Sequence, residues 1–428
     1  MKRSALLVPA LVAVAATVLP PPARAIPNVF FGNGFIGPIV PAFPRFNANL
    51  TRDFLAAENW RENQFPGPWE DAADETPGAR RMTAMPVLFG AVPMAVTAHA
   101  SQTGVGPGEI EIVYLDAGRY FGYLAGGEKT RDQRDAGETK RDEFDRHFRR
   151  LADDLRQRLD TGCGAARRVV LGRSDLLRET FSDYRCDAFT LRLLVRDGHS
   201  VALRLFPAGS EPRSLVAGPL EGEAAAARAN RLAENTRSNP RGDLVIDGVP
   251  MFAQQTTPFC GVHSLAMAAR YFGLELRPGD LAAAAEFKNT GSARGSRLLD
   301  LHHAAAEEIG MNLKVSSRFD FDRVARAVRE GRPVIVWRRV SLDREKARLI
   351  QMANLGAQPL PTLSQSVRDA LPPRDKKGSP SHASIVTGIN EQTREVLYTE
   401  PWGDATRNLR MRGEELADTV YAAFFFES

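Results

Sequence analysis

The feature that most constrains the fold is a turn leading directly into an amphipathic helix whose first residue is a cysteine. The segment reads QQTTPFCGVHSLAMAARYFG and runs from Gln254 to Gly273. Counted from Cys260, apolar residues recur at +2, +5, +9 and +12. This spacing places them on one side of a helix. We therefore expect a helix that begins at Cys260 and is buried along one face.

The position of this cysteine favours reactivity. A thiol at a helix N-terminus lies near unsatisfied N–H groups and the positive end of the helix dipole, and both stabilise the thiolate, which is the nucleophilic form. Gln254 lies six residues upstream and can offer an amide donor to a developing oxyanion. The same pattern is compatible with a buried structural cysteine, because free cysteines are among the most buried residues.

A base for this thiol can be sought among only seven histidines. His382 opens the stretch HASIVTGINEQTREVLYTEPWGD, in which ASIVTGI and EVLYTE read as two strands around a polar turn near residues 390–393. A hairpin centred there brings His382 opposite Glu400. A carboxylate beside a histidine orients its ring and stabilises the imidazolium that forms when the thiol loses its proton.

Together these residues resemble papain-fold cysteine peptidases, in particular bacteriocin-leader peptidases and phytochelatin synthases. The shared features are Gln at −6, the run Cys-Gly-x-x-Ser-Leu-x-Met from Cys260, and the downstream His382. The resemblance implies that Cys260 is the nucleophile, His382 the general base and acid, Gln254 the oxyanion donor, and Glu400 the third member of the triad. It covers about Asp243 to Ser428.

Glu400 departs from the family pattern, which usually has Asp or Asn at this position. The extra methylene must be absorbed by the backbone or the rotamer. Asp404 and Asn390 are the fallback candidates for the third residue. Because Glu400 departs from this pattern, a catalytically silent binding module that keeps the peptidase fold remains an alternative.

The N-terminus predicts export. Lys2 and Arg3 precede an apolar run over residues 5–19, and Ala-Arg-Ala follows at 23–25, which is typical of a secretory signal peptide rather than a membrane span. We predict an α+β protein with four segments: a signal peptide (1–25), an N-terminal α+β domain of unknown role (26–206), a linker (207–242) and a papain-like cysteine peptidase domain (243–428). The protein is expected to be secreted or periplasmic, with no membrane span.

The N-terminal domain carries no motif that names its role. An inhibitory pro-domain, a substrate- or wall-binding module, a partner-docking domain and a scaffold all remain open. Residues 141–159 have helical apolar spacing, and strands are expected at 85–90, 91–98, 110–117, 120–126, 167–172, 188–196 and 200–206.

Charge and motifs exclude several classes of partner. The formal net charge is +4, but Lys2, Arg3 and Arg24 leave with the signal peptide, so 53 basic residues face 52 acidic ones. The charges are interspersed and form no basic stripe with stacking aromatics, so nucleic-acid binding is not expected. His302 and His303 lack metal-ligand spacing to other His or Cys residues. We expect no cofactor and no metal, and the sequence does not indicate an oligomeric state.

Three cysteines in an exported chain leave one unpaired. Because the catalytic interpretation requires Cys260 to be free, we expect a disulfide between Cys163 and Cys186.

The segment between the strand at 333–340 and His382 reads as an insertion, with a helix at 341–356 and a Pro-punctuated loop at 358–381. It is expected either to border the active-site cleft or to be an inert surface excursion.

The sequence therefore predicts a thiol-dependent peptidase that cleaves peptide-type amide bonds in a peptide or protein substrate. A glutathione transpeptidase or hydrolase similar to phytochelatin synthase is the first alternative. The cysteine-rich tail of many such synthases is absent here.

Overall fold

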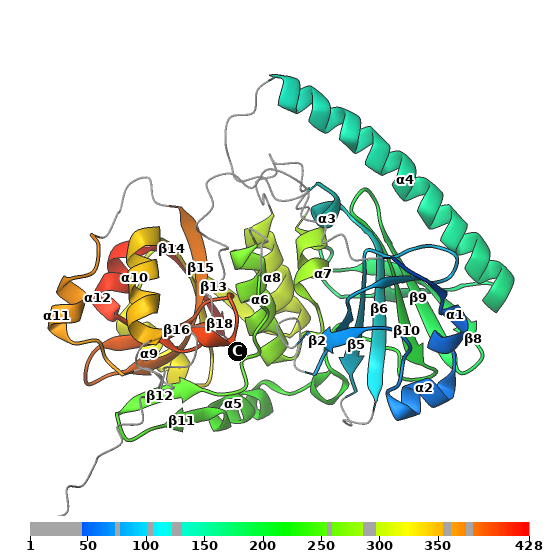
Figure 1. The fold of residues 1–428 in the computed structure, drawn as a ribbon. Helices are drawn as coiled ribbons and strands as arrows, with labels where there is room; N and C mark the ends of the chain where they lie inside the picture. The colour runs from blue at the N-terminus through cyan, green and yellow to red at the C-terminus, as the bar shows by residue number, and fades with distance from the viewer. Residues whose placement is uncertain are drawn as a thin grey trace, which may run out of the picture.

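The computed structural model describes residues 45–72, 78–101, 106–121, 131–254, 259–285, 297–353, 361–373 and 380–427. The predicted signal peptide lies outside these residues. Two sheet-containing halves lie side by side, with helices α6, α7 and α8 between the two sheets (Figure 1). Mixed helix and sheet is the class that the sequence predicts.

The N-terminal half is built on an eight-stranded antiparallel sheet in the order β2-β3-β5-β6-β10-β9-β8-β7. A short parallel pair, β1 with β4, lies beside it. The bounds of these strands and of the short helices are β1 Arg45–Asn49, α1 Thr51–Phe54, α2 Ala57–Glu62, β2 Trp69–Asp71, β3 Arg80–Met82, β4 Met85–Val87, β5 Ala95–Ala100, β6 Pro107–Asp116, α3 Ala117–Phe121, β7 Arg167–Leu171, β8 Glu179–Cys186, β9 Phe189–Arg196 and β10 Ser200–Pro207.

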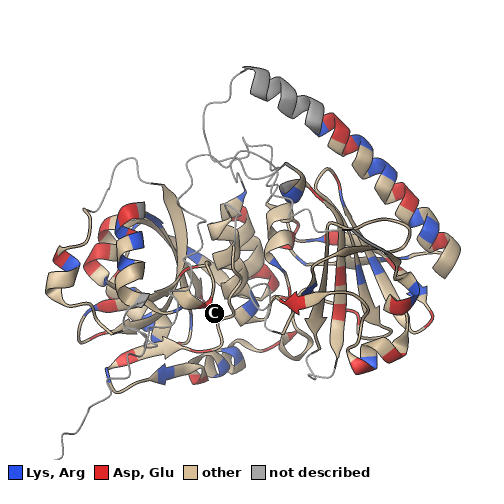
Figure 2. Cartoon of the chain, in the orientation of Figure 1, with Lys and Arg blue, Asp and Glu red and all other residues tan. Residues whose placement is uncertain are grey.

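A long helix, α4 (Arg131–Cys163), packs on this sheet and is longer than the 141–159 that the sequence predicts. Its buried side, including Phe144, Phe148 and Leu155, belongs to the same hydrophobic cluster as the sheet. Over residues 141–163, charged residues make up much of the rest of the helix (Figure 2). Cys163, the last residue of α4, is joined by a disulfide to Cys186 at the end of β8.

The C-terminal half has a sheet in the order β11-β12-β15-β14-β18-β13, and β16 and β17 extend from β15. The elements of this half are β11 Thr236–Ser238, β12 Asp243–Ile246, α6 Cys260–Phe272, α7 Pro278–Ala284, α8 Leu298–Glu308, β13 Asn312–Ser316, α9 Phe321–Arg329, β14 Val334–Arg339, α10 Leu342–Ala353, α11 Gln365–Asp369, β15 Ser381–Asn390, β16 Glu395–Thr399, η3 Asp404–Thr406, β17 Leu409–Arg412, α12 Gly413–Thr419 and β18 Val420–Glu427.

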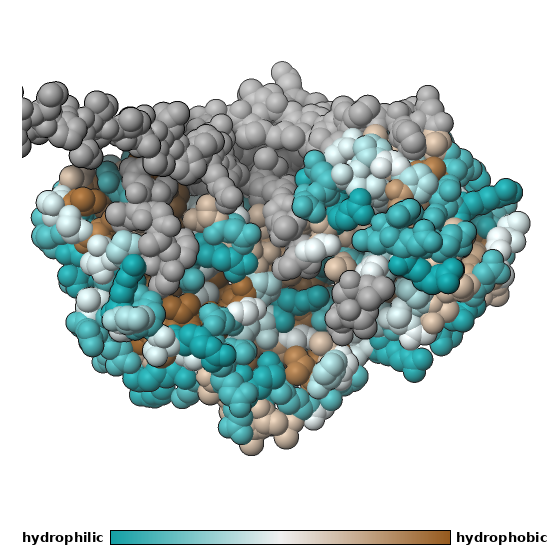
Figure 3. Space-filling model, turned by 60° about the horizontal axis from the view of Figure 1, so that its bottom comes forward, coloured by the Kyte–Doolittle hydropathy of each residue, from teal (hydrophilic) through white to brown (hydrophobic). Residues whose placement is uncertain are grey.

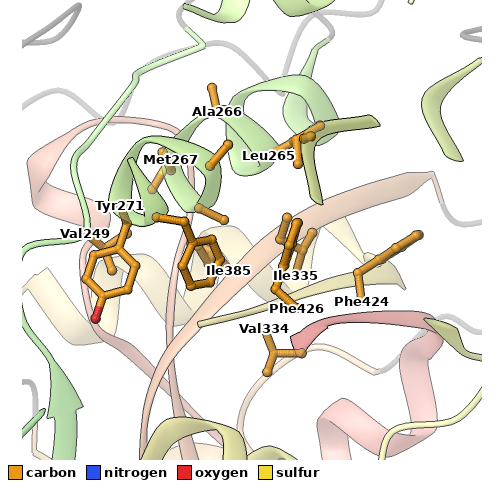
Figure 4. Packing of buried hydrophobic residues seen from close by; sticks show 14 of the residues in the cluster. Val249, Leu265, Ala266, Met267, Tyr271, Val334, Ile335, Ile385, Phe424 and Phe426 are labelled. Carbon is orange, nitrogen blue, oxygen red and sulfur yellow. The ribbon is translucent and has the colours of Figure 1, made fainter. Parts of the chain in front are cut away.

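Helix α6 packs against the central strands of this sheet. Leu265 and Met267 of the helix and Ile335 and Ile385 of the strands are buried in one cluster (Figure 4). The strands β14 and β15 are almost wholly buried, which explains their continuous apolar runs. The helix that begins at Cys260 is thereby fixed to the sheet that carries His382.

Residues 207–242, expected to be a linker, hold structured elements. They contain η2 (Gly218–Leu220), α5 (Ala225–Glu234) and β11, which pairs with β12 of the C-terminal sheet. The guanidinium of Arg228 in α5 donates to the carbonyl of Gly310 over 2.9 Å. This stretch is therefore integrated into the C-terminal half, because its backbone and a buried arginine are bonded there.

The two halves meet through helix α7 and the N-terminal sheet. Asp280 of α7 accepts from Arg196 of β9 at 2.6 Å and from Arg204 of β10 at 2.8 Å. Arg277 donates to Glu109 of β6 at 2.7 Å. We call Glu109, Glu111, Arg196, Arg204, Arg277 and Asp280 the interdomain cluster. Apolar residues of β8, β9 and α6 also share one hydrophobic cluster across this boundary.

The surface is mixed in character. On the face drawn in Figure 3, hydrophilic residues predominate among the described atoms, and hydrophobic patches are interspersed among them. Among the described residues, no helix is both long enough and apolar enough to cross a bilayer.

Candidate active site

Cys260 is the first residue of α6 and is partly exposed. The preceding N-cap residue, Phe259, makes no side-chain cap, so the first-turn N–H groups receive no capping oxygen from it. Position 261 requires a glycine because α6 packs closely against Trp337 of β14. A Cβ at this position would lie 2.2 Å from Cζ2 of the indole. This close packing fixes the helix start relative to the sheet.

His382 lies on β15, next to the strand β14 residue Arg338 in the register of the sheet. The β15–β16 hairpin pairs Ile385 with Thr399, so Glu400 follows directly beside Ser384. Oε2 of Glu400 lies 2.5 Å from Nε2 of His382. Oε1 accepts a hydrogen bond from the Ser384 hydroxyl over 2.9 Å. The hairpin therefore brings together the histidine and the glutamate that the sequence paired.

His382 interacts with the thiol as well as with Glu400. The side chains of Cys260 and His382 lie close enough for each to displace the pKa of the other, and the backbone of Ala383 also acts on the thiol. The ring of His382 lies 5.0 Å from that of Trp402, which restricts its rotation. Cys260, His382 and Glu400 thus form one continuous chain of contacts, with His382 and Glu400 1% and 0% exposed.

The charges of these groups reinforce one another. Burial raises the pKa of Cys260, but the His382 imidazolium more than offsets this and holds that pKa below the ordinary thiol value. Burial lowers the pKa of His382, whereas Glu400 and the Cys260 thiolate raise it to about 9. Burial also raises the pKa of Glu400, and His382 together with Arg338 lowers it to about 2. The arrangement favours a thiolate–imidazolium pair at neutral pH.

The segment that ends at Gln254 is held by two hydrogen bonds. The N–H of Gln254 donates to the carbonyl of Pro401 over 2.7 Å, one residue after Glu400. Two residues before it, the carbonyl of Phe252 bonds Nδ1 of His263 in α6 at 2.9 Å. The segment is therefore held between the helix that carries Cys260 and the loop that carries Glu400. Residues 255–258, which complete the predicted turn, lie outside the described residues.

The fallback candidates for the third residue have other partners. The amide of Asn390 donates to Asp243 at 2.8 Å, at the far end of β15 from His382. Asp404 has a largely exposed side chain and pairs with Arg407 at 2.7 Å. Neither contact involves His382.

Sequence reasoning did not identify Arg338. This arginine is 2% exposed and donates to Oε1 of Glu400 over 2.7 Å and to Ser384 over 3.2 Å. It also donates to Glu345 of α10 over 3.2 Å. Two adjacent arginines in the otherwise apolar run PVIVWRRV were the available signal, but they do not indicate which of the two is buried or that its partner lies 62 residues away.

The described residues contain no group of three or more His, Cys, Asp or Glu side chains arranged to hold a metal ion. Two of the other histidines, His263 and His302, are buried, and burial lowers the pKa of each to about 4. Both bond backbone carbonyls, which gives them a role in packing.

Comparison with known proteins bears on the C-terminal part of the chain. No curated protein matches the sequence. Among solved structures, a C39-like peptidase candidate from Bacillus anthracis is matched at 12% identity and a TM-score of 0.27, over 44% of this chain and 98% of that one. A TM-score this low adds nothing to the argument. Residues 246–426 match the model of the Peptidase_C39 like family, and this match supports a papain-like cysteine peptidase domain in the C-terminal part of the chain.

Proposed function

We propose that this protein is an exported thiol peptidase that hydrolyses peptide-type amide bonds in a peptide or protein substrate. Cys260 is the nucleophile, His382 the general base and acid, and Glu400 the carboxylate that orients His382. Gln254 supplies an oxyanion donor. Export rests on the predicted signal peptide at residues 1–25, and it delivers the protein to the periplasm or the exterior.

The single observation that carries the proposal is the buried contact chain from Cys260 through His382 to Glu400, with 2.5 Å between the imidazole and the carboxylate. A packing cysteine needs no such partner. A thiolate that is held beside an imidazolium, at a helix start and partly exposed, has the properties of an acyl-transfer nucleophile. The match to the Peptidase_C39 like family supports the same chemistry.

The reaction follows from this geometry. The Cys260 thiolate attacks the carbonyl carbon, and the oxyanion accepts hydrogen bonds from the Gln254 amide and the backbone N–H of Cys260. The His382 imidazolium gives its proton to the leaving amine, and the C–N bond breaks to leave a thioester on Cys260. Neutral His382 then takes a proton from water, whose oxygen attacks the thioester, and the thiolate is released with the acid product.

The test is a substrate profile of the mature protein, residues 26–428. The protein is incubated with a peptide library and, in parallel, with glutathione, and new amine ends are detected by mass spectrometry. Cleavage of longer peptides that disappears in Cys260→Ala supports the peptidase. Transfer of γ-glutamylcysteine units without peptide cleavage would replace it with the phytochelatin-synthase-like function. Binding of peptides without cleavage would indicate the silent module.

A further inference from the structure

A line of buried charged side chains starts at His382 and Glu400 and leads away from Cys260. Arg338 of β14 joins Glu400 to Glu345 of α10, over 2.7 Å and 3.2 Å respectively. Arg348 of α10 pairs with both Glu345 and Glu415 of α12. We call this series of contacting side chains the site charge chain; in spatial order its members are His382, Glu400, Arg338, Glu345, Arg348 and Glu415. Its members alternate in sign.

The chain is closed to solvent. The side chains of Arg338 and Arg348 are each 2% exposed, and those of Glu345 and Glu415 are 5% and 6% exposed. Arg344 of α10 completes it by donating to Glu415 at 2.8 Å. Charges held in such an interior interact strongly, and removal of one partner leaves the other uncompensated.

Helix α10 is therefore attached to the site by charge. The sequence left open whether the segment after β14 is an inert surface excursion. Three buried charged residues of α10 (Arg344, Glu345 and Arg348) point instead into the site charge chain. The hydroxyl of Tyr398 donates to Glu345 over 3.2 Å and holds the same carboxylate from β16.

We propose that Arg338, seated by Glu345 of α10, is a positioning residue that fixes the Glu400 carboxylate and keeps it charged, and so sets the pH range in which Cys260 is reactive. The inference rests on the proposed function for its kinetic consequences but not for its effect on the thiol. It explains how a glutamate serves at the third position. Arg338 and Ser384 occupy Oε1, so that Oε2 faces His382.

The sign of the effect follows from the groups that surround Glu400. They are His382 and Ser384 of β15 and Arg338 of β14, with Cys260 of α6 beyond His382. Glu345 of α10 faces Arg338 from the other side. Loss of the positive charge at Arg338 makes every one of the titrating groups bind protons more readily. Loss of the negative charge at Glu345 does the opposite.

The experiment measures the rate of Cys260 alkylation by iodoacetamide against pH, which requires no substrate. In Arg338→Met, the acid limit of alkylation, which is the pH below which alkylation is lost, should move up, because removing a nearby positive charge raises the pKa of the groups around it. In Glu345→Gln this limit should move down. The charge-balanced double variant R338M/E345Q should return toward the wild-type position.

Arg338→Lys separates positioning from charge. It keeps the cation but loses the planar fork that reaches Glu400, Ser384 and Glu345 together. Its alkylation limit should stay near that of the wild type, while kcat on a cleaved peptide falls and KM changes little. If Arg338 and Glu345 had only a structural role, Arg338→Met and Glu345→Gln would not shift the acid limit of Cys260 alkylation in opposite directions.

An unmoved limit in folded Arg338→Met, checked by near-UV circular dichroism, overturns the inference. If Arg338→Met does not fold, Glu345→Gln decides alone, and an unmoved or raised limit there overturns it. A shifted limit without any peptide cleavage leaves the positioning role intact and removes the peptidase function. Peptide cleavage by the wild type together with an unmoved alkylation limit in the variants would support the peptidase function and remove the positioning role.

Discussion

Two of the buried charge networks in the described part of the chain, the interdomain cluster and the site charge chain, differ in one respect: only the second ends at a group that can react. In the interdomain cluster, Asp280 is held ionised because Arg204, Arg196 and Arg277 outweigh the burial that raises its pKa. In the site charge chain, Arg338 and His382 act on Glu400 in the same way. The difference lies in the next residue: beyond His382 lies a partly exposed thiol, whereas the interdomain cluster consists of carboxylates and arginines.

This comparison shows that a displaced pKa does not by itself identify a site. Structural ion networks displace pKa values as strongly as catalytic ones. What distinguishes the C-terminal network is a nucleophile, a histidine whose pKa is raised to about 9, and access from solvent. If this distinction holds, changes in the site charge chain should affect the reactivity of Cys260, and changes in the interdomain cluster should affect stability alone.

The largest expected effect is the loss of turnover in Cys260→Ala and in His382→Ala. Each removes a reacting group, so hydrolysis should fall to the background of the assay in both variants. The unfolding temperature of Cys260→Ala should change little, because the thiol is partly exposed. That of His382→Ala should fall, because the buried Glu400 carboxylate loses its partner. Normal turnover in folded Cys260→Ala would place the chemistry elsewhere in the chain.

Glu400→Gln should lower turnover by about 10- to 10⁴-fold, the range seen when a triad carboxylate loses its charge. The amide no longer stabilises the imidazolium, so the pKa of His382 should fall from its raised value. Asp404→Asn is the matched control, since Asp404 has a 64% exposed side chain and pairs only locally with Arg407. If both variants retain wild-type turnover, the contact at Glu400 has no catalytic role.

Asp280→Asn tests the other network. Removing one partner of a buried ion cluster leaves Arg196 and Arg204 uncompensated, which should lower the free energy of unfolding by about 3–5 kcal/mol. The pH profile of Cys260 alkylation should be unchanged at temperatures where the variant is folded. Asp175→Asn is the control, because Asp175 is 95% exposed and such pairs contribute about 1 kcal/mol or less. An altered thiol profile in Asp280→Asn would show that the two networks are coupled.

The smallest expected effect concerns the disulfide. Cys163 and Cys186 are 23 residues apart, and opening a loop of this size should lower the free energy of unfolding by about 3 kcal/mol. Replacing both with serine should shift the denaturant midpoint without changing turnover, because the bridge joins α4 to β8 far along the chain from Cys260. A loss of turnover in the folded double variant would contradict the separation of the two halves.

The parts of the site that the sequence predicts are those with local signals. Cys260 follows a turn and starts a periodic apolar run, and His382 and Glu400 are linked by a single hairpin. Arg338 and Glu345 were not identified, because their contacts with the site depend on how β14, α10 and β15 pack. No spacing rule connects residues that meet only through the tertiary fold.

The N-terminal half shows the same limit. Glu109 and Glu111 alternate with apolar residues along β6, a pattern that ordinarily turns the polar face of a strand to water. Here α7 covers that face, and Arg277 pairs with both carboxylates. The strand predicted at 120–126 is also wrong at its start, where α3 occupies residues up to Phe121. Aromatic content favours strands, but Tyr120 lies in α3 and packs its ring 5.2 Å from that of Phe144 of α4.

The central claim is that Cys260 is held as a thiolate by His382. The most direct test is the rate of Cys260 alkylation against pH, in the wild type and in His382→Ala. Fast alkylation should persist in the wild type at pH values where an ordinary thiol, with a pKa of about 8.5, is protonated. His382→Ala should return the profile to that of an ordinary thiol. Turnover, unlike alkylation, should fall as the pH rises through about 9, where His382 loses its proton. An ordinary thiol profile in the wild type, unchanged in His382→Ala, would contradict the account.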